Sequence, residues 1–295
     1  MPLNLQGIFP PVPTPFENSH FAPHRLVENL SRLNETGLSG YVVLGSNGEA
    51  PLLSRTEKLE IVRVARRTIP TEKRMIVGAG MESTEATAVF TMQVADLGAE
   101  AALVLTPFFY RESMSHEALR RHFEKIAEAS PIPILIYNVP KFTNLNVSVS
   151  LVAQLAQHEN IIGMKDSAGN LSQLLEFREK TPADFQILLG SDAIFFAALA
   201  HNFRSAILAL ANVAPRELVE LRRLVDNNQW EAAQGLANKL APVGRLIISR
   251  LGVPGLKAAL DELGYFGGTP RPPLLALEEP ARLEIREVLR QAGLL

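Results

Sequence analysis

The segment Ile132-Pro-Ile-Leu-Ile-Tyr137, followed along the chain by Ile161-Ile-Gly-Met-Lys165, decides the fold. Both are short apolar runs without the polar and apolar alternation of a half-exposed strand, which is typical of parallel strands buried on both faces. Longer stretches of helical period separate such runs. The pattern predicts strands that alternate with helices.

Eight apolar runs of this kind occur. They cover residues 7–12, 41–44, 75–79, 101–106, 132–137, 161–165, 185–189 and 206–210. Eight alternations favour a closed (β/α)8 TIM barrel over an open doubly wound sheet, which usually has fewer strands and a glycine-rich phosphate loop after the first. The first run here leads into prolines instead. We therefore predict an α/β protein with a TIM barrel.

Helix signals lie between the runs, where we expect helices at 24–36, 54–68, 84–97 and 115–129. Ser54-Arg-Thr-Glu57 has the spacing of a capping box, and Gly37 and Gly98 stand where a helix end favours a left-handed residue. Further helices are expected at 215–226, 229–250, 255–263 and 280–292, with an extended connection before the last one. This predicts a barrel over 1–214 and a helical extension over 215–295 that packs on it.

The composition narrows the class of function. With 47% hydrophobic and 20% charged residues, the chain has enough apolar material for a large core. The net charge of -2, with basic residues spread along the chain, argues against nucleic acid or an anionic membrane as partner. Neither a targeting segment nor a membrane-spanning run is visible, so a cytoplasmic protein that acts on a small molecule is expected.

Metal and cofactor chemistry find no support in the sequence. There is no cysteine, which removes disulfides, thiolate metal sites and cysteine nucleophiles. The six histidines form no zinc-binding spacing, and the dinucleotide and P-loop glycine patterns are absent. We therefore expect neither a metal nor a cofactor.

In a TIM barrel the active site lies at the carboxyl ends of the strands. The polar residues that follow the apolar runs are Thr14, the turn Gly45-Ser-Asn-Gly-Glu49, Thr106, Tyr137, Lys165, Ser191 and Asp192. This set offers an amine, a phenol, hydroxyl groups and backbone donors.

Lys165 is the candidate nucleophile, because its apolar run would carry the amine into the barrel mouth. Burial in a medium of low dielectric constant disfavours the charged ammonium, and the neutral amine is the form that attacks a carbonyl. The alternative is a lysine whose head group reaches solvent from a strand end.

Tyr137 closes the preceding strand, so its hydroxyl could relay protons in the same cavity. The alternative is a core tyrosine whose hydroxyl bonds a backbone carbonyl. The two glycines around Ser46 and Asn47 suit a tight turn that receives a carboxylate, although an ordinary turn into the next helix has the same composition.

The order and spacing of these motifs resemble the dihydrodipicolinate synthase and N-acetylneuraminate lyase superfamily across essentially the whole chain. The motifs are 11–16, Gly45-Ser-Asn-Gly-Glu49, Thr106-Pro107, Tyr137-Asn-Val-Pro140 and Gly163-Met-Lys-Asp166. The resemblance implies a pyruvate Schiff base on Lys165, with Tyr137 and Ser46 as further catalytic residues. It also implies that Ser46 and Asn47 hold the 2-oxo acid carboxylate, that Gly190 and the carbonyl of Ile207 line the pocket, and that the protein is a homotetramer.

Within the superfamily the resemblance is strongest to 4-hydroxy-2-oxoglutarate aldolases, which release pyruvate and glyoxylate. It rests on Gly45-Ser-Asn-Gly-Glu49, Ala209-Leu-Ala-Asn-Val213, Gly252-Val-Pro-Gly-Leu-Lys257 and Gly264-Tyr-Phe-Gly-Gly268. Two departures from dihydrodipicolinate synthases agree with it. Phe109 replaces a relay tyrosine, which is then missing unless the next residue, Tyr110, substitutes for it. Phe142 stands where those enzymes carry a carboxylate-binding arginine.

Three functions follow from the sequence. The first is a class I aldolase that cleaves 4-hydroxy-2-oxoglutarate, or a similar acid, through a pyruvate–lysine intermediate. The second uses the same chemistry to condense pyruvate with aspartate semialdehyde, as 4-hydroxy-tetrahydrodipicolinate synthase. The third is a 2-oxo acid binding protein without turnover, which the loss of the relay tyrosine keeps open.

Overall fold

The computed structural model describes residues 3–295. Eight strands form its main sheet: β1 (Gly7–Phe9), β4 (Gly40–Val43), β5 (Arg74–Gly78), β6 (Ala101–Leu105), β7 (Ile134–Asn138), β8 (Ile161–Asp166), β9 (Gln186–Leu189) and β10 (Ser205–Ile207). Each lies on one of the eight predicted apolar runs. Their almost complete burial explains why polar residues do not alternate along them.

The strand order is that of a closed barrel. It runs β1-β10-β9-β8-β7-β6-β5-β4, and the pairs from β5 to β10 are parallel. A parallel bridge between Pro11 and Val42 joins the segments of β1 and β4 at the two ends of this order. An order of eight parallel strands that returns to its start defines a (β/α)8 barrel, so the prediction of a TIM barrel is confirmed.

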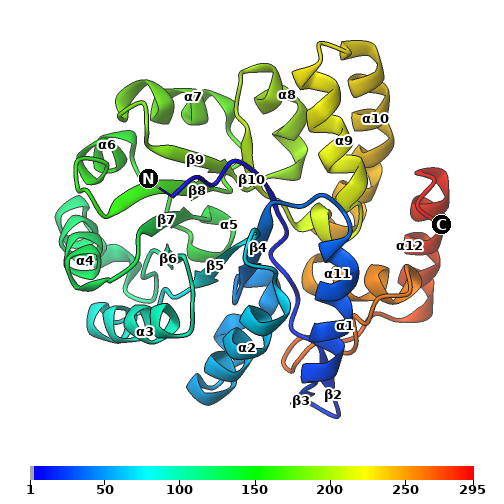
Figure 1. The fold of residues 1–295 in the computed structure, drawn as a ribbon, viewed down its shortest axis with the longest axis horizontal. Helices are drawn as coiled ribbons and strands as arrows, with labels where there is room; N and C mark the ends of the chain where they lie inside the picture. The colour runs from blue at the N-terminus through cyan, green and yellow to red at the C-terminus, as the bar shows by residue number, and fades with distance from the viewer. Residues whose placement is uncertain (1–2) are drawn as a thin grey trace. The chain divides into compact units, whose positions relative to one another are not determined.

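One compact unit comprises Met75–Ile207 and, of the described N-terminal residues, 3–6. Its helices are α3 (Thr84–Asp96), α4 (His116–Ala129), α5 (Pro140–Thr143), α6 (Val149–Leu155), α7 (Leu171–Lys180) and α8 (Phe195–Ala200). In Figure 1, α3, α4, α6 and α7 lie along the outer side of strands β6 to β9. Phe123 on α4 and Phe177 on α7 are fully buried, so the apolar faces of these helices form part of the core.

The second compact unit combines Gly7–Arg74 with Leu208–Leu295. Its longer helices are α1 (Pro23–Asn34), α2 (Arg55–Thr68), α9 (Pro215–Asp226), α10 (Trp230–Val243), α11 (Gly252–Glu262) and α12 (Glu279–Gln291). Figure 1 shows α9 and α10 side by side, and these two helices contact each other, as do α11 and α12. The helices that we assigned to an extension therefore belong to the unit that contains β1 and β4. The boundary between residues 214 and 215 stays a prediction.

The expected helix boundaries agree with local capping. Ser54 precedes α2, its side chain accepts from the amide of Glu57, and the Glu57 side chain accepts from the Ser54 amide, which is the predicted capping box. Gly37 and Gly98 have φ values of 82° and 87°, as expected for residues that end helices.

Two features of the second unit were not predicted. A small antiparallel pair, β2 (Phe16–Glu17) with β3 (His20–Phe21), follows β1. The single helix expected over 229–250 is divided into α10 and the π-helix Gly244–Arg250. Pro242, which has no amide hydrogen to donate, lies just before the change in hydrogen bonding. None of the helices within residues 3–295 has the length and hydrophobicity needed to cross a membrane.

Candidate active site

Lys165 and Tyr137 lie on neighbouring parallel strands. The register of β7 and β8 sets Tyr137 opposite Lys165. The Nζ atom of Lys165 lies 4.4 Å from the centroid of the Tyr137 ring. Lys165 is 4% exposed and Tyr137 is 6% exposed. The structure thus brings together the two residues that the sequence predicted as nucleophile and proton relay, and it places the amine away from bulk solvent.

The ring face of Tyr137 suits a nitrogen that becomes positively charged. An aromatic face carries negative electrostatic potential, and a cation above it is stabilised by about 0.5–2 kcal/mol, more where water is excluded. An iminium at the Nζ atom of Lys165 would gain this stabilisation. The arrangement therefore suits the positive charge that this nitrogen carries once it is bonded to a carbonyl carbon.

Gly190 borders the Lys165 side chain. Its amide donates to the backbone carbonyl of Asp166 at 2.6 Å, directly after β9. A Cβ atom at Gly190 would lie 3.0 Å from Cε of Lys165 and 2.1 Å from Oγ of Ser167. The lack of a side chain at this position leaves the space in which the amine stands. Ile207 ends β10, the strand paired with β9, and is 1% exposed; the role of its carbonyl stays a prediction.

A buried polar pair lies next to the reactive pair, one residue further along the same strands. Asn138 is the register partner of Asp166, and its Nδ2 donates to Oδ1 of Asp166 at 2.6 Å. Nδ2 also donates to Oδ1 of Asn146 at 2.8 Å, and Oδ1 of Asn138 accepts from the amide of Val147 at 3.1 Å. These contacts tie the ends of β7 and β8 to the segment before α6, so they fix the strands that carry Tyr137 and Lys165.

Asp166 has an unusual electrostatic environment. Its residue is fully buried, and burial raises the pKa of its carboxyl, although the hydrogen bond from Asn138 acts in the opposite direction. Its Oδ2 has no hydrogen-bond partner within residues 3–295. Sequence reasoning missed this residue because Asp166 was considered only as part of a motif. The signal was present, since an aspartate that directly follows a buried lysine in a strand faces the other side of the sheet.

Thr106 provides a further polar group in the same unit. It follows β6, whose last residue, Leu105, is the register partner of Tyr137. Thr106 is 1% exposed, and its Oγ1 has no hydrogen-bond partner among the residues that the structure describes. A buried hydroxyl without a partner costs free energy, so a ligand or a water that bonds to it would be stabilised.

The turn that contains Ser46 and Asn47 belongs to the second compact unit. It forms the short 3-10 helix η1 (Ser46–Gly48), with Gly45 extended and Glu49 left-handed at φ 57°. Ser46 and Asn47 are half-buried, and Oγ1 of Thr14 donates to the carbonyl of Gly48 at 2.7 Å. The predicted tight turn is therefore present. The roles of Ser46 and Asn47 toward a substrate stay predictions.

The two phenylalanines that mark the sequence departures, and Tyr110 beside the first of them, are exposed. Phe109 is 74% and Tyr110 is 72% exposed, with ring centroids 5.1 Å apart in an edge-to-face arrangement. The Glu82 carboxylate accepts from the amides of Phe108 and Phe109 at 3.0 and 2.9 Å, which holds their loop. Phe142 is half-exposed on α5, with the Lys141 ammonium 6.0 Å from its ring centroid. Neither phenylalanine supplies a proton donor or a positive charge.

No group of three histidine, aspartate or glutamate side chains within residues 3–295 is arranged to hold a metal ion. His122 is the one buried histidine in this part of the chain. Its Nδ1 shares a hydrogen bond of 2.8 Å with Oγ1 of Thr84, and burial lowers its pKa to about 4. A neutral imidazole packed between helices has a structural role.

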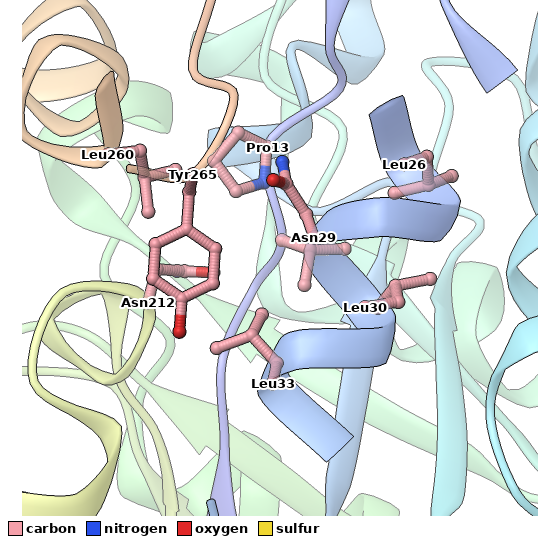
Figure 2. A pocket seen from close by; sticks show the side chains of 9 residues that line it. Pro13, Leu26, Asn29, Leu30, Leu33, Asn212, Leu260 and Tyr265 are labelled. Carbon is pink, nitrogen blue, oxygen red and sulfur yellow. The ribbon is translucent and has the colours of Figure 1, made fainter. Parts of the chain in front are cut away.

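A small cavity lies within the second unit. Its lining includes Leu30, Leu33, Asn212 and Tyr265, and its volume is about 10 Å³ (Figure 2). Such a space holds about one water molecule. The fully buried Oδ1 of Asn212 has no partner within residues 3–295, so it is the atom that a water there would satisfy. A three-carbon acid does not fit.

Comparison with known proteins gives one consistent result. The model of the dihydrodipicolinate synthetase family matches residues 4–292. The 4-hydroxy-tetrahydrodipicolinate synthase of Methanosphaerula palustris is 34% identical over 97% of this chain and 98% of its own length. That of Archaeoglobus fulgidus is 32% identical over 99% of both chains.

Solved structures agree. A crystal structure of a dihydrodipicolinate synthase aligns with a TM-score of 0.92 and 32% identity over 98% of this chain and 100% of its own. The dihydrodipicolinate synthase of Thermotoga maritima aligns with a TM-score of 0.92 and 29% identity over 99% of both chains. The chain is therefore an enzyme, a pyruvate-dependent aldolase of the class I type, and it belongs to the dihydrodipicolinate synthetase family.

Proposed function

We propose that Lys165 forms a Schiff base with the C2 carbonyl of pyruvate. The observation that carries the proposal is the buried Lys165 amine, 4.4 Å from the ring centroid of Tyr137. The amine adds to C2 to give a carbinolamine, which loses water to become an iminium. Tyr137 and Ser46 move the protons that the addition and dehydration require.

The remaining predicted residues bind the acid. Ser46 and Asn47 hold its carboxylate through the hydroxyl, amide and backbone donors of their turn. Gly190 and the carbonyl of Ile207 line the pocket around the Schiff base. The proposed reaction requires neither a metal nor a cofactor, because the iminium itself withdraws electrons from the neighbouring carbon.

The carbon–carbon step uses the iminium in either direction. In condensation, the iminium loses a proton from C3, and the resulting enamine carbon attacks the carbonyl carbon of an aldehyde, whose oxygen takes up a proton. In cleavage, the 4-hydroxyl gives up its proton, the C3–C4 bond breaks, and its electron pair forms the enamine as the aldehyde leaves. Protonation at C3 and hydrolysis then release pyruvate and restore the Lys165 amine.

The second substrate that the comparisons support is aspartate semialdehyde. The relatives of 32–34% identity described above carry the name 4-hydroxy-tetrahydrodipicolinate synthase. This favours condensation over the cleavage reaction that the sequence analysis placed first. We therefore propose synthase activity as the first candidate.

Cleavage of 4-hydroxy-2-oxoglutarate is the second candidate, and it stays open because a specific observation counts against aspartate semialdehyde. Phe109 and Phe142 stand where the synthases that the motifs resemble carry a relay tyrosine and a carboxylate-binding arginine, and both side chains are exposed hydrocarbon. Arginine binds a carboxylate through two parallel hydrogen bonds, which phenylalanine cannot replace. An acceptor with a distal carboxylate and amine would lose these contacts.

Parallel assays of the purified protein test both candidates. One measures condensation of pyruvate with aspartate semialdehyde, and the other measures pyruvate release from 4-hydroxy-2-oxoglutarate by coupling to lactate dehydrogenase. The larger kcat/KM identifies the second substrate. Activity in either assay that survives Lys165→Ala at the wild-type level would contradict the Schiff-base mechanism.

We also propose that the protein is a cytoplasmic homotetramer, built as a dimer of dimers. The support is the resemblance to a family whose members commonly assemble in this way. Size-exclusion chromatography with light scattering measures the molar mass of the assembly, and a mass that corresponds to one chain would contradict the proposal.

A further inference from the structure

A fully buried ion pair joins the turn after β4 to the C-terminal helices. The Nζ atom of Lys257, on α11, lies 2.6 Å from Oε1 of Glu49, and both side chains are 0% exposed. Burial lowers the pKa of Lys257, while the charge of Glu49 opposes this change. Because isolated charges are excluded from protein interiors, each of these groups depends on the other.

Further contacts hold both groups in place. The Lys257 ammonium donates to the carbonyl of Thr269 at 3.2 Å and lies 4.4 Å from the centroid of the Phe16 ring. Oε2 of Glu49 accepts from the amide of Arg271 at 2.7 Å. The pair thus gathers the segment after α11 and the turn after β4 around one buried charge centre.

The guanidinium of Arg271 extends this network to the start of α2. It forms an ion pair of 2.7 Å with Glu57, the acidic member of the capping box of α2, and it donates to the carbonyl of Leu52 at 3.2 Å. Both ends of the segment between η1 and α2 are therefore attached to residues that come from the C-terminal part of the chain.

The backbone at Glu49 explains why the turn needs such an attachment. Glu49 has φ 57° and ψ 30°. This left-handed conformation is unfavourable in free energy for a residue other than glycine. It immediately follows Ser46, Asn47 and Gly48. A side chain held by a buried charge keeps this residue in its strained conformation, and the conformation sets the direction of the turn before it.

The glycine motif near the C-terminus allows the contact to form. A Cβ atom at Gly267 would lie 1.8 Å from the carbonyl oxygen of Lys257, and Gly268 has φ 69°. Only a chain without these side chains can pass so close to α11 and present the Thr269 carbonyl and the Arg271 amide. The glycines of the motif Gly264-Tyr-Phe-Gly-Gly268, which in the sequence indicated only kinship, thus allow the close approach to α11.

We propose that Lys257 and Glu49 are positioning residues that hold Ser46 and Asn47 in the conformation that receives the substrate carboxylate. This inference rests on the proposed function, because that function assigns the carboxylate to this turn. The C-terminal helices then contribute to substrate affinity without contacting the substrate.

Four variants test the proposal. Lys257→Met and Glu49→Gln each remove one charge with little change in side-chain length, and the double variant removes both. Glu284→Gln is the matched control, because it breaks the exposed ion pair with Arg250 on the surface. The measurements are KM for pyruvate, kcat, borohydride trapping at saturating pyruvate, and hydrogen exchange of the amides in residues 46–53.

The expected result is a loss of pyruvate affinity together with a loosened turn. Each single variant raises KM for pyruvate roughly tenfold to a hundredfold, because a small displacement of binding groups has effects of this size. Turnover falls as well, because the displaced turn carries Ser46, whereas borohydride at saturating pyruvate still traps the adduct on Lys165. The amides of 46–53 exchange faster. The double variant lies closer to the wild type than either single variant, because no charge is left unpaired. Glu284→Gln matches the wild type.

Folded single variants with wild-type KM and wild-type exchange in 46–53 would overturn the proposal. If the single variants do not fold, the decision passes to the wild-type protein. A measurement on the wild-type protein is independent of any variant: saturating pyruvate must slow exchange in 46–53 and in 267–271 together, and protection confined to the first segment would also overturn it. If the wild type traps no pyruvate, the proposed function fails, while exchange in the ligand-free variants still tests the coupling.

Discussion

Replacing Gly190 by alanine should displace the Lys165 amine. The new Cβ atom would lie 3.0 Å from Cε of Lys165, 2.9 Å from the backbone carbonyl oxygen of Asp166 and 2.1 Å from Oγ of Ser167. The hydroxyl of Ser167 can rotate away at little cost, whereas the Asp166 carbonyl accepts the hydrogen bond from the Gly190 amide and cannot move freely. The lysine side chain is therefore the group that has to shift.

The size of the effect follows from the geometry. Ordinary contact between carbon atoms is about 3.5–4.0 Å, so the Lys165 side chain must move by roughly 0.5–1 Å. A displacement of about 1 Å at a reacting group costs up to roughly a hundredfold in rate. We expect Gly190→Ala to lower kcat/KM by roughly tenfold to a hundredfold, and to slow borohydride trapping by a similar factor.

The matched control is Gly235→Ala on α10. A Cβ atom there meets nothing within 4 Å, and alanine favours a helix by roughly 0.5–1 kcal/mol over glycine. This variant should keep wild-type kinetics and unfold at a slightly higher temperature. A folded Gly190→Ala protein with kcat/KM within about twofold of the wild type would refute the argument that this glycine makes room for the amine.

Three further predictions concern stability and its dependence on pH. Burial lowers the pKa of His122 from 6.5 to about 4, so as pH falls the unfolded chain binds the proton before the folded chain does. The contribution to stability should therefore be complete above pH 6.5 and fall by roughly 3 kcal/mol toward pH 4. Urea unfolding of His122→Gln should lack this fall. Burial raises the pKa of Asp166. Its contribution to stability is therefore present below the ordinary aspartate pKa and is lost as pH rises through the pKa of the folded state. An Asp166→Asn protein with the wild-type pH profile of stability would contradict this. Ser115 caps α4 by accepting from the amide of Ala118 at 3.2 Å, and Ser115→Ala should cost about 1 kcal/mol in thermal unfolding without changing kcat/KM.

The barrel could be predicted because its signals are local. Eight buried runs, a capping box at Ser54 and left-handed glycines at 37 and 98 are each contained within a short stretch of sequence. The pair Tyr137 and Lys165 was also predictable, since both residues end neighbouring strands and parallel strands bring their carboxyl ends to one side. The π-helix at Gly244–Arg250 was not, because a few residues of helical period do not distinguish one hydrogen-bond spacing from another.

The buried polar networks could not be predicted from the sequence in the same way. Lys257 and Glu49 lie far apart in the chain, and no local pattern says that they meet. A lysine within the apolar stretch of α11 and a glutamate after a tight turn were each visible, but their pairing depends on how the chain folds back. The same holds for the pair of Asn138 and Asp166, which becomes evident only when the register of β7 and β8 is known.

Covalent trapping tests the central claim most directly. The protein is incubated with pyruvate, reduced with borohydride and digested, and the peptides are sequenced by mass spectrometry. We predict one reduced pyruvyl group per chain, on Lys165, and its loss in Lys165→Ala. Modification of another lysine such as Lys257, or an unmodified chain at saturating pyruvate, would contradict the Schiff-base mechanism.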